Sequence, residues 1–170
     1  MVLDKKIAMV IATNGYRDEE YDVPKEHFLK NGAKVTTVNS NGTTSKSMFG
    51  KTAEVDGSIH DINPDDYDAI VFVGGTGAAE YFTNTKATDL AKKFNEQGKI
   101  VAAICIAPSI LANAHILMGK KATAYPSERE NINAEGTYTG SPVEIDGNII
   151  TASGPDAAFQ FAEAIVRALS

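Results

Sequence analysis

Four apolar segments rich in valine and isoleucine recur along the chain, at residues 7–12, 35–38, 69–73 and 100–104. They are largely uninterrupted, whereas a strand exposed on one face would alternate apolar with polar residues. Each is therefore typical of a strand buried on both faces. Segments with helical spacing lie between several of them. The pattern predicts an α/β fold with a mostly parallel sheet and helices on both of its faces.

Proline and glycine residues mark the expected helix boundaries. Pro24 can occupy the first turn of one helix, and Gly32 and Gly98 can end two others by adopting left-handed dihedral angles. The last helix is expected over residues 155–169, with an apolar stripe that packs on the sheet. The stripe consists of Phe159, Ala162, Ile165, Val166 and Leu169.

Two stretches depart from the alternation of strands and helices. Residues 39–60 are rich in Gly, Ser and Thr with short apolar pairs, which predicts a small antiparallel excursion. Asp146-Gly147 separates two short apolar runs and predicts a tight hairpin, because this dipeptide readily supplies the positive φ of a type I′ turn. Since no linker or repeat interrupts the chain, we expect a single domain over residues 1–170.

Composition narrows the classes of function. A formal net charge of -6 and a pI near 5.0 argue against nucleic acid and anionic membranes as partners, because both attract clustered Lys and Arg. The apolar run near the N-terminus is too short for a membrane span and lacks a signal-peptide cleavage pattern. Cys105 is the only cysteine, and no Cys/His spacing suggests a metal site. We therefore expect a cytoplasmic protein that needs no metal and no cofactor.

The sharpest local feature of the sequence surrounds Cys105. A buried strand ends just before it, and Pro108 follows where the first turn of a helix would begin. Such a strand-to-helix turn projects one side chain over the carboxyl edge of the sheet, where helix N–H groups favour a thiolate. Open parallel sheets bind ligands at this edge. A free cysteine is also common as a small core residue, so this segment alone leaves both roles open.

Two more strand ends are expected at the same edge. Residues 71–77 end a buried strand in glycines, and the N–H groups of Gly75 and Ile106 are predicted to form an oxyanion hole. A simple turn would equally explain these glycines. Their spacing matches neither the dinucleotide fingerprint nor a phosphate loop, which disfavours nucleotide binding. Residues 14–24 carry several carboxylates, and composition alone does not single out one of them.

Together these segments resemble the ThiJ/PfpI superfamily over nearly the whole chain. The resemblance rests on Glu20 four residues before Pro24, on a Gly-Gly strand end at Gly74, on the Ala-Ile-Cys-x-x-Pro turn at Cys105, and on residues 146–155. The superfamily includes a parkinsonism-associated deglycase and an intracellular protease. The resemblance implies a flavodoxin-like three-layer sandwich and a homodimer.

The resemblance also implies roles for individual residues. Glu20 would be the buried carboxyl group that hydrogen-bonds the nucleophilic sulfur of Cys105, and Gly74 and Tyr125 would line the pocket. A thiol and a carboxyl group in one buried pocket cannot easily both ionise. They are therefore expected to share a proton, with Glu20 protonated beside a thiolate.

The sequence departs from the family pattern at three positions. Ile106 stands where the protease-like and glyoxalase-like branches place a histidine directly after the nucleophile, and Tyr125 replaces a histidine of the deglycase branch. Ser153 replaces an arginine, which lowers the anion affinity expected there. The loss of a general base weakens the case for peptidase or amidotransferase chemistry. The histidines of the chain are expected to be structural or exposed, and they are His27, His60 and His115.

These observations favour a protein that acts through Cys105 on small electrophiles in a glyoxalase- or deglycase-like hydrolase or lyase reaction, or that serves as a redox-sensing thiol oxidised by peroxide. Whether turnover occurs is left open. An alternative from another class is a non-catalytic binding or chaperone-like homodimer, because a fold does not fix a function. A peptidase or isonitrile hydratase-like enzyme ranks below both.

Overall fold

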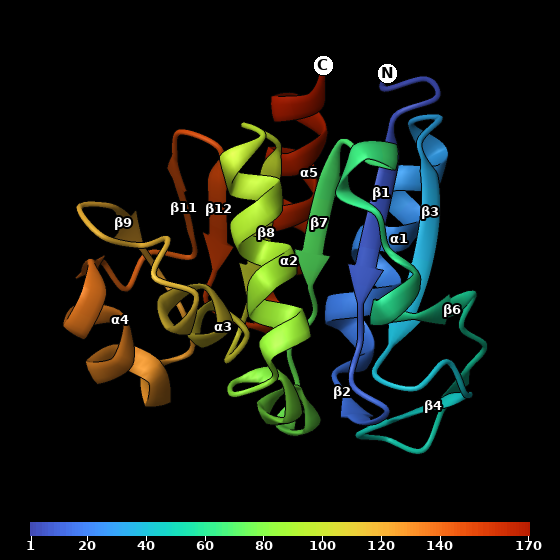
Figure 1. Cartoon of the computed structure of the whole chain (residues 1–170), viewed down its shortest axis with the longest axis horizontal. Coiled ribbons are helices and arrows are strands. Elements are labelled where there is room, and N and C mark those ends of the chain that lie inside the picture. Colours follow the sequence, from blue (N-terminus) through green and yellow to red (C-terminus); the bar gives the residue numbers. More distant parts are fainter.

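A seven-stranded sheet forms the centre of the molecule (Figure 1), in the order β11-β12-β8-β7-β1-β3-β6. The computed structural model describes residues 1–170. All neighbours pair in parallel except β11, which runs antiparallel to β12. The strands are β1 (Lys6–Val10), β3 (Lys34–Asn39), β6 (Gly57–Ser58), β7 (Ala69–Phe72), β8 (Ile100–Ile104), β11 (Val143–Asp146) and β12 (Ile149–Ala152).

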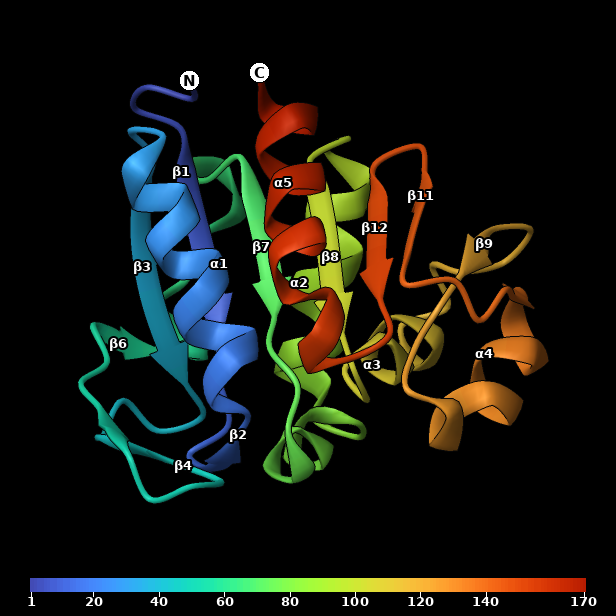
Figure 2. The same ribbon diagram turned by 180° about the vertical axis from the view of Figure 1, so that it is seen from behind.

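Helices cover both faces of this sheet. Helices α1 (Asp18–Lys30) and α5 (Ala158–Leu169) pack side by side on one face (Figure 2). Helices α2 (Thr85–Glu96) and α3 (Pro108–Asn113) lie on the other, and α4 (Arg129–Glu135) packs against α3. Each face has its own apolar core, formed by side chains of alternate strand residues. The predicted mostly parallel α/β sandwich is confirmed.

Short elements complete the chain around the sheet. The predicted antiparallel excursion is confirmed, because β4 pairs antiparallel with β5 while β2 pairs parallel with β4. The remaining strands are β2 (Asn14–Tyr16), β4 (Ser45–Ser47), β5 (Thr52–Ala53), β9 (Lys121–Ala122) and β10 (Thr137–Tyr138). The 3₁₀ turns are η1 (Ile59–Asp61), η2 (Pro64–Asp66), η3 (Thr76–Tyr81), η4 (Pro126–Glu128) and η5 (Pro155–Ala157).

The start of the first helix differs from the prediction, whereas two helix ends match it. Gly32 and Gly98 have φ of 89° and 71° just after α1 and α2, as expected. Helix α1, however, begins at Asp18, and Pro24 lies inside it. Acidic residues in the first turn besides the buried Glu20 favour an N-terminus there, because negative charges complement the helix dipole. Packing of α1 on the sheet and on α5 offsets the hydrogen bond that Pro24 cannot donate.

Two further local predictions need correction. The β11–β12 hairpin is present, but Asp146 remains in the strand and the turn residues are Gly147 and Asn148. Only Gly147 has a positive φ, at 62°, which is the pattern of a type II′ turn and not of type I′. The carboxylate of Asp146 accepts a hydrogen bond from the N–H of Lys121. Phe159 is 52% exposed and does not belong to the sheet-facing stripe of α5.

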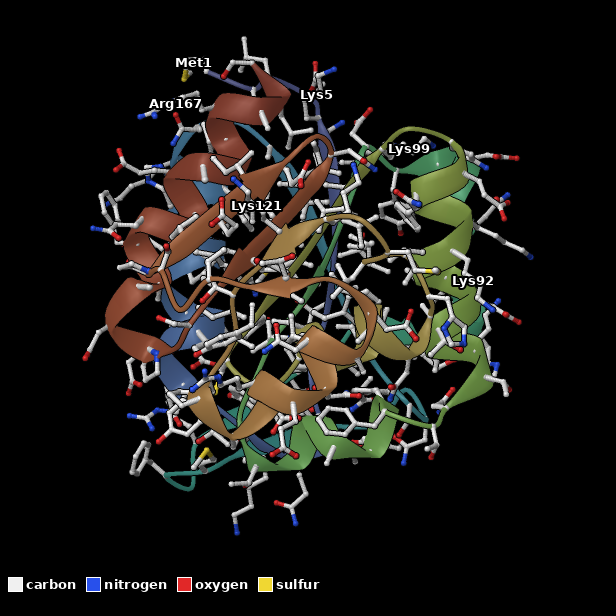
Figure 3. The ribbon with its side chains drawn as sticks, turned by 90° about the vertical axis from the view of Figure 1, so that its left-hand side faces the viewer. Met1, Lys5, Lys92, Lys99, Lys121 and Arg167 are labelled. Atoms are coloured by element: carbon white, nitrogen blue, oxygen red, sulfur yellow. The ribbon has the colours of Figure 1, made fainter.

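The surface carries basic side chains on many elements. Figure 3 labels Lys5, Lys92, Lys99, Lys121 and Arg167, which come from the start of the chain, from α2 and its end, from β9 and from α5. No helix has both the length and the apolar character needed to cross a membrane.

Candidate active site

The carboxyl ends of β1, β7 and β8 bring together the three segments that the sequence singled out. The N–H of Arg17, which follows β2, donates to the carbonyl of Gly74 after β7 over 3.0 Å. Cys105 follows β8, and its N–H donates to the carbonyl of Ala152 over 3.0 Å. The N–H of Tyr125 donates to the carbonyl of Cys105 over 2.8 Å. Backbone hydrogen bonds therefore hold the acidic segment, the glycine segment and the cysteine turn at one sheet edge.

Cys105 occupies the sharp turn between β8 and α3. Its backbone φ is 66°, in the left-handed region that residues other than glycine rarely adopt. Pro108 is the first residue of α3 and has no N–H that would need a partner at this position. The thiol is half-buried, while Ile104 before it and Ala107 after it are fully buried. The turn thus lifts one side chain out of the sheet core.

Glu20 lies beside this thiol in the first turn of α1, and its side chain is completely buried. Gly74 makes the close approach possible. A Cβ atom on Gly74 would overlap the Glu20 carboxyl group and would lie 2.5 Å from the Cβ atom of Cys105. Only a glycine fits between these two side chains. The structure therefore places Cys105 and Glu20 side by side. Gly74, which the resemblance implied as a pocket residue, lies between these two side chains and is not among the residues that line the pocket described below.

Burial dominates the electrostatics of the Cys105–Glu20 pair. Burial raises the pKa of Glu20 to about 7, which the neighbouring thiol, Arg17 and the N–H of Gly74 partly offset. Although this N–H lies close, neither carboxyl oxygen of Glu20 has a hydrogen-bond partner of normal geometry. A buried carboxylate without a well-placed donor is unstable, so this site favours the protonated form of Glu20.

The thiol responds to the same burial. Burial and then the negative charge of Glu20 raise the pKa of Cys105 to about 12, and the N–H groups of Gly75 and Ile106 act in the opposite direction. The sequence predicts a lowered thiol pKa from the helix terminus alone, and the enclosure of the sulfur acts against this. The contribution of Glu20 disappears when Glu20 holds the proton, so the two groups titrate as a coupled pair.

Cys105 opens into a pocket of about 530 Å³ at the sheet edge. The predicted residues Gly75, Ile106 and Tyr125 line it. Sequence reasoning did not assign several other lining residues to the site. These are Arg17, Met48, Thr76, Ser127, Pro155 and Asp156. Arg17 lies in the same acidic segment after the first strand as Glu20. This position at the carboxyl edge of the sheet was the sequence signal that could have assigned Arg17 to the site.

A second pocket, of about 260 Å³, lies next to the first. It shares Tyr125, Pro155 and Asp156 with the Cys105 pocket and includes Ser153, where the family pattern has an arginine. The exposed ring of Tyr125 therefore forms a wall between two adjoining hollows.

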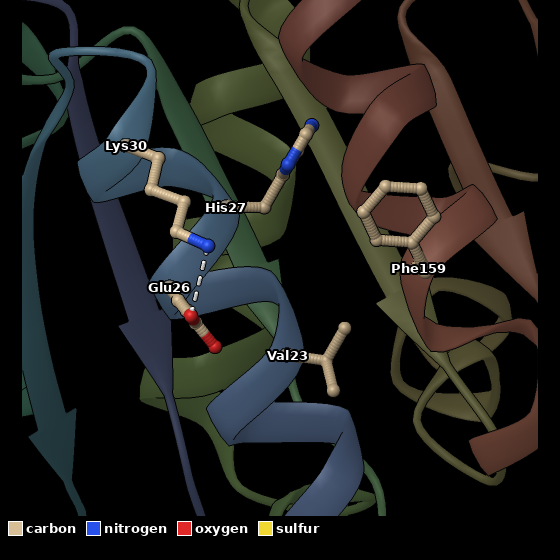
Figure 4. Close-up of a pocket in the computed structure, with 5 residues that line it drawn as sticks. All are labelled: Val23, Glu26, His27, Lys30 and Phe159. Carbon is tan, nitrogen blue, oxygen red and sulfur yellow. Dashed lines mark ion pairs between the residues drawn. The ribbon is translucent and has the colours of Figure 1, made fainter.

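The histidines lie elsewhere. His60 is exposed in η1, and His115 is exposed and pairs with Glu135 over 2.9 Å. His27 lines a shallow hollow of about 90 Å³ between α1 and α5 (Figure 4), where its ring lies 5.0 Å from that of Phe159. This hollow shares no residue with the Cys105 pocket. No histidine of the chain lines the pocket that holds the thiol.

Comparison with known proteins places these features in context. The model of the DJ-1/PfpI family matches residues 5–168. An uncharacterized protein of Methanocaldococcus jannaschii is 44% identical, covering 96% of this chain and 82% of the relative. Deglycase PfpI of Pyrococcus furiosus is 30% identical, over 95% of this chain and 98% of the relative. The crystal structure of a ThiJ/PfpI domain protein from Brachyspira murdochii superposes with a TM-score of 0.95 at 30% identity, covering 98% of this chain and 97% of that one.

Proposed function

Because the chain belongs to the DJ-1/PfpI family, we propose that it acts through Cys105 on small electrophilic carbonyl compounds, in a reaction of the glyoxalase or deglycase type. One observation carries the proposal. Cys105 stands on a left-handed turn facing a pocket, with the buried acid Glu20 and the N–H groups of Gly75 and Ile106 beside its sulfur. The relative from Pyrococcus furiosus is named a deglycase, which agrees with this class of chemistry.

The proposed reaction needs a thiolate beside a protonated acid. In the free protein the order is reversed, because burial raises the pKa of Glu20 to about 7 and that of Cys105 to about 12, so the carboxyl group ionises first. The N–H groups of Gly75 and Ile106 act to lower the pKa of Cys105, and the proton must pass from the thiol to Glu20 before the first step. Glu20 then holds the proton that the first step needs.

The proposed reaction with an α-oxoaldehyde begins with addition of the thiolate to the aldehyde carbon. A C–S bond forms, the carbonyl electrons move to oxygen, and Glu20 gives this oxygen its proton to yield a hemithioacetal. The N–H groups of Gly75 and Ile106 would stabilise the developing oxyanion. Glu20 then removes the C–H proton and returns it to the adjacent carbon, while the hydroxyl proton passes to the neighbouring carbonyl oxygen. This leaves a thioester, which water hydrolyses to the hydroxy acid and the free thiol of Cys105. The sequence is an internal isomerisation followed by hydrolysis, so it consumes no oxidant.

Methylglyoxal turnover tests this proposal. We expect Cys105→Ser to abolish lactate formation and Glu20→Gln to reduce kcat by about 10²-fold or more, because the variant amide cannot transfer the proton. His27→Asn serves as a control outside the pocket and should keep the wild-type rate. Equal rates for wild type and Cys105→Ser would refute a cysteine-dependent reaction. A large loss in His27→Asn would indicate that a histidine takes part after all.

A second candidate is a redox-sensing thiol, which the buried acid also favours. The thiolate would attack a peroxide oxygen, leaving a sulfenic acid and hydroxide, and a second peroxide would give the sulfinic acid. Glu20 would donate a hydrogen bond to the oxidised sulfur. We expect a mass increase of about 32 Da per chain after dilute peroxide, for two added oxygen atoms. If Glu20→Gln changes neither the yield nor the lifetime of this product, the hydrogen bond has no role.

A further inference from the structure

Arg17 is the one cationic residue among those that line the Cys105 pocket. The only other lining residue with a formal charge at neutral pH is Asp156, apart from the reactive thiol itself. The remaining wall consists of glycine, hydroxyl, aromatic, aliphatic and thioether groups. Any preference of the pocket for a charged substrate therefore depends on these two side chains.

The side chain of Arg17 is held in place on two sides. Its Nε donates to Oε2 of Glu19 over 2.6 Å, and its guanidinium lies 5.0 Å from the ring centroid of Phe49. The backbone N–H of Arg17 is bound to Gly74, as described above. Such contacts restrict the orientations of the guanidinium before any ligand arrives, which lowers the entropy lost on binding.

The terminal nitrogens of Arg17 are free. Its only side-chain hydrogen bond uses Nε, so Nη1 and Nη2 have no partner within the chain. These two nitrogens form the fork that binds a carboxylate through two parallel hydrogen bonds. The side chain is 29% exposed. The hydrogen bond to Glu19 is the main cause of the raised pKa of Arg17, and Glu20 and Cys105 add to it, so Arg17 lies within electrostatic range of the thiol.

We propose that Arg17 is a specificity-determining residue that selects electrophiles carrying a carboxylate beside the reactive carbonyl or carbon atom over neutral electrophiles. The inference deepens the proposed function, because it names the substrate class for the same thiol. The carboxylate binds to the free guanidinium nitrogens while the electrophilic carbon faces the sulfur. Asp156 also lines the pocket, and its negative charge repels anions. An anionic substrate is therefore attracted at Arg17 and not elsewhere in the pocket.

Alkylation of the single thiol tests this without any need for turnover. Iodoacetate and iodoacetamide are nearly equal in size and share a leaving group, and they differ in charge. The rate of alkylation of Cys105 by iodoacetate is divided by its rate with iodoacetamide. This ratio, divided by the same ratio for a small free thiol, measures the preference of the pocket for the anion. We expect a ratio well above one in wild type and a fall of about tenfold in Arg17→Gln, as expected for loss of one charge-assisted contact.

Three variants act as controls for this measurement. Lys51→Gln removes a positive charge from the neighbouring β4–β5 turn, outside the pocket lining, and should leave the ratio unchanged. Arg17→Lys should keep part of the preference, because the charge remains and the fork is lost. Asp156→Asn should raise the ratio. An Arg17→Gln ratio within twofold of wild type would overturn the proposal, as would an equal fall in Lys51→Gln.

Protection by aldehydes provides the second readout. Glyoxylate carries a carboxylate next to its aldehyde, and it should slow alkylation of Cys105 by forming a hemithioacetal. We expect Arg17→Gln to weaken protection by glyoxylate and to leave protection by methylglyoxal unchanged; equal weakening of both would contradict the proposal. If wild type shows the anion preference but no methylglyoxal turnover, the proposed function fails while the role of Arg17 stands.

Discussion

At the scale of single residues, the protonation of Glu20 differs between the folded and the unfolded protein just below neutral pH. Its carboxyl group is fully buried without a well-formed hydrogen bond, and its pKa is raised to about 7 from 4.5. At pH values between 4.5 and about 7, the carboxyl group of Glu20 is ionised in the unfolded chain and protonated in the folded chain. This contribution therefore favours the folded state at low pH and is lost as the pH rises through about 7.

Glu20→Gln should remove this pH dependence. From the raised pKa, the stability advantage of the variant over wild type should grow by about 2 kcal/mol between about pH 5.5 and about pH 8. Urea unfolding of both proteins at the two pH values measures the change. A constant difference between the two proteins would mean that Glu20 ionises normally in the fold.

The sequence predicted the identity of the central residues better than their electrostatic state. The strand-to-helix turn at Cys105 and the glycines after β7 could be located because apolar runs, glycine and proline are local signals. The enclosure of the sulfur could not, because burial depends on segments distant in the chain. The same limit hid Arg17, whose neighbours Gly74 and Phe49 come from two other segments.

At the scale of elements, the wall of the pocket opposite α1 depends on how α3 holds the Tyr125–Arg129 region. Buried Ser109 of α3 donates to Oε1 of Glu128 over 2.7 Å, and exposed Ser127 donates to Oε2 of the same carboxylate over 2.7 Å. The two hydrogen bonds have the same length and acceptor. They differ in solvent access: if the serine hydroxyl group were removed, water could take its place at exposed Ser127 but not at buried Ser109.

We expect Ser109→Ala to lower the free energy of unfolding by about 1–2 kcal/mol, because the hydrogen bond of a buried hydroxyl group to a half-buried carboxylate is lost. Ser127→Ala is the matched comparison and should change it by no more than about 0.5 kcal/mol. Thermal or urea unfolding of the two variants at neutral pH provides the test. Equal losses would show that burial of Ser109 contributes nothing extra.

Element boundaries also show where sequence patterns stop being informative. Pro24 is tolerated within α1 because the helix packs on the sheet and against α5, and neither contact can be read from the local sequence. Phe159 has the spacing of a buried residue, yet the orientation of α5 points it toward His27 of α1. Helical periodicity predicted the existence of these helices and left their rotation undetermined.

At the scale of the whole molecule, several large apolar side chains remain exposed on different elements. They include Leu3, Leu29, Phe49 and Phe159, all more than half exposed. We propose, as the family resemblance implies, that two chains form a homodimer. Light scattering after size exclusion should give a mass near twice the 18.1 kDa of one chain. A mass of one chain at micromolar concentration would contradict a stable dimer.

The left-handed backbone at Cys105 has an evolutionary consequence. A residue with a Cβ atom at a φ of 66° costs about 1–2 kcal/mol relative to glycine, which adopts this angle freely. Selection for stability alone would therefore replace this cysteine with glycine. A protein lineage that keeps sulfur here accepts a less stable fold in exchange for reactivity, and Cys105→Gly should test this trade-off by melting at a temperature no lower than wild type.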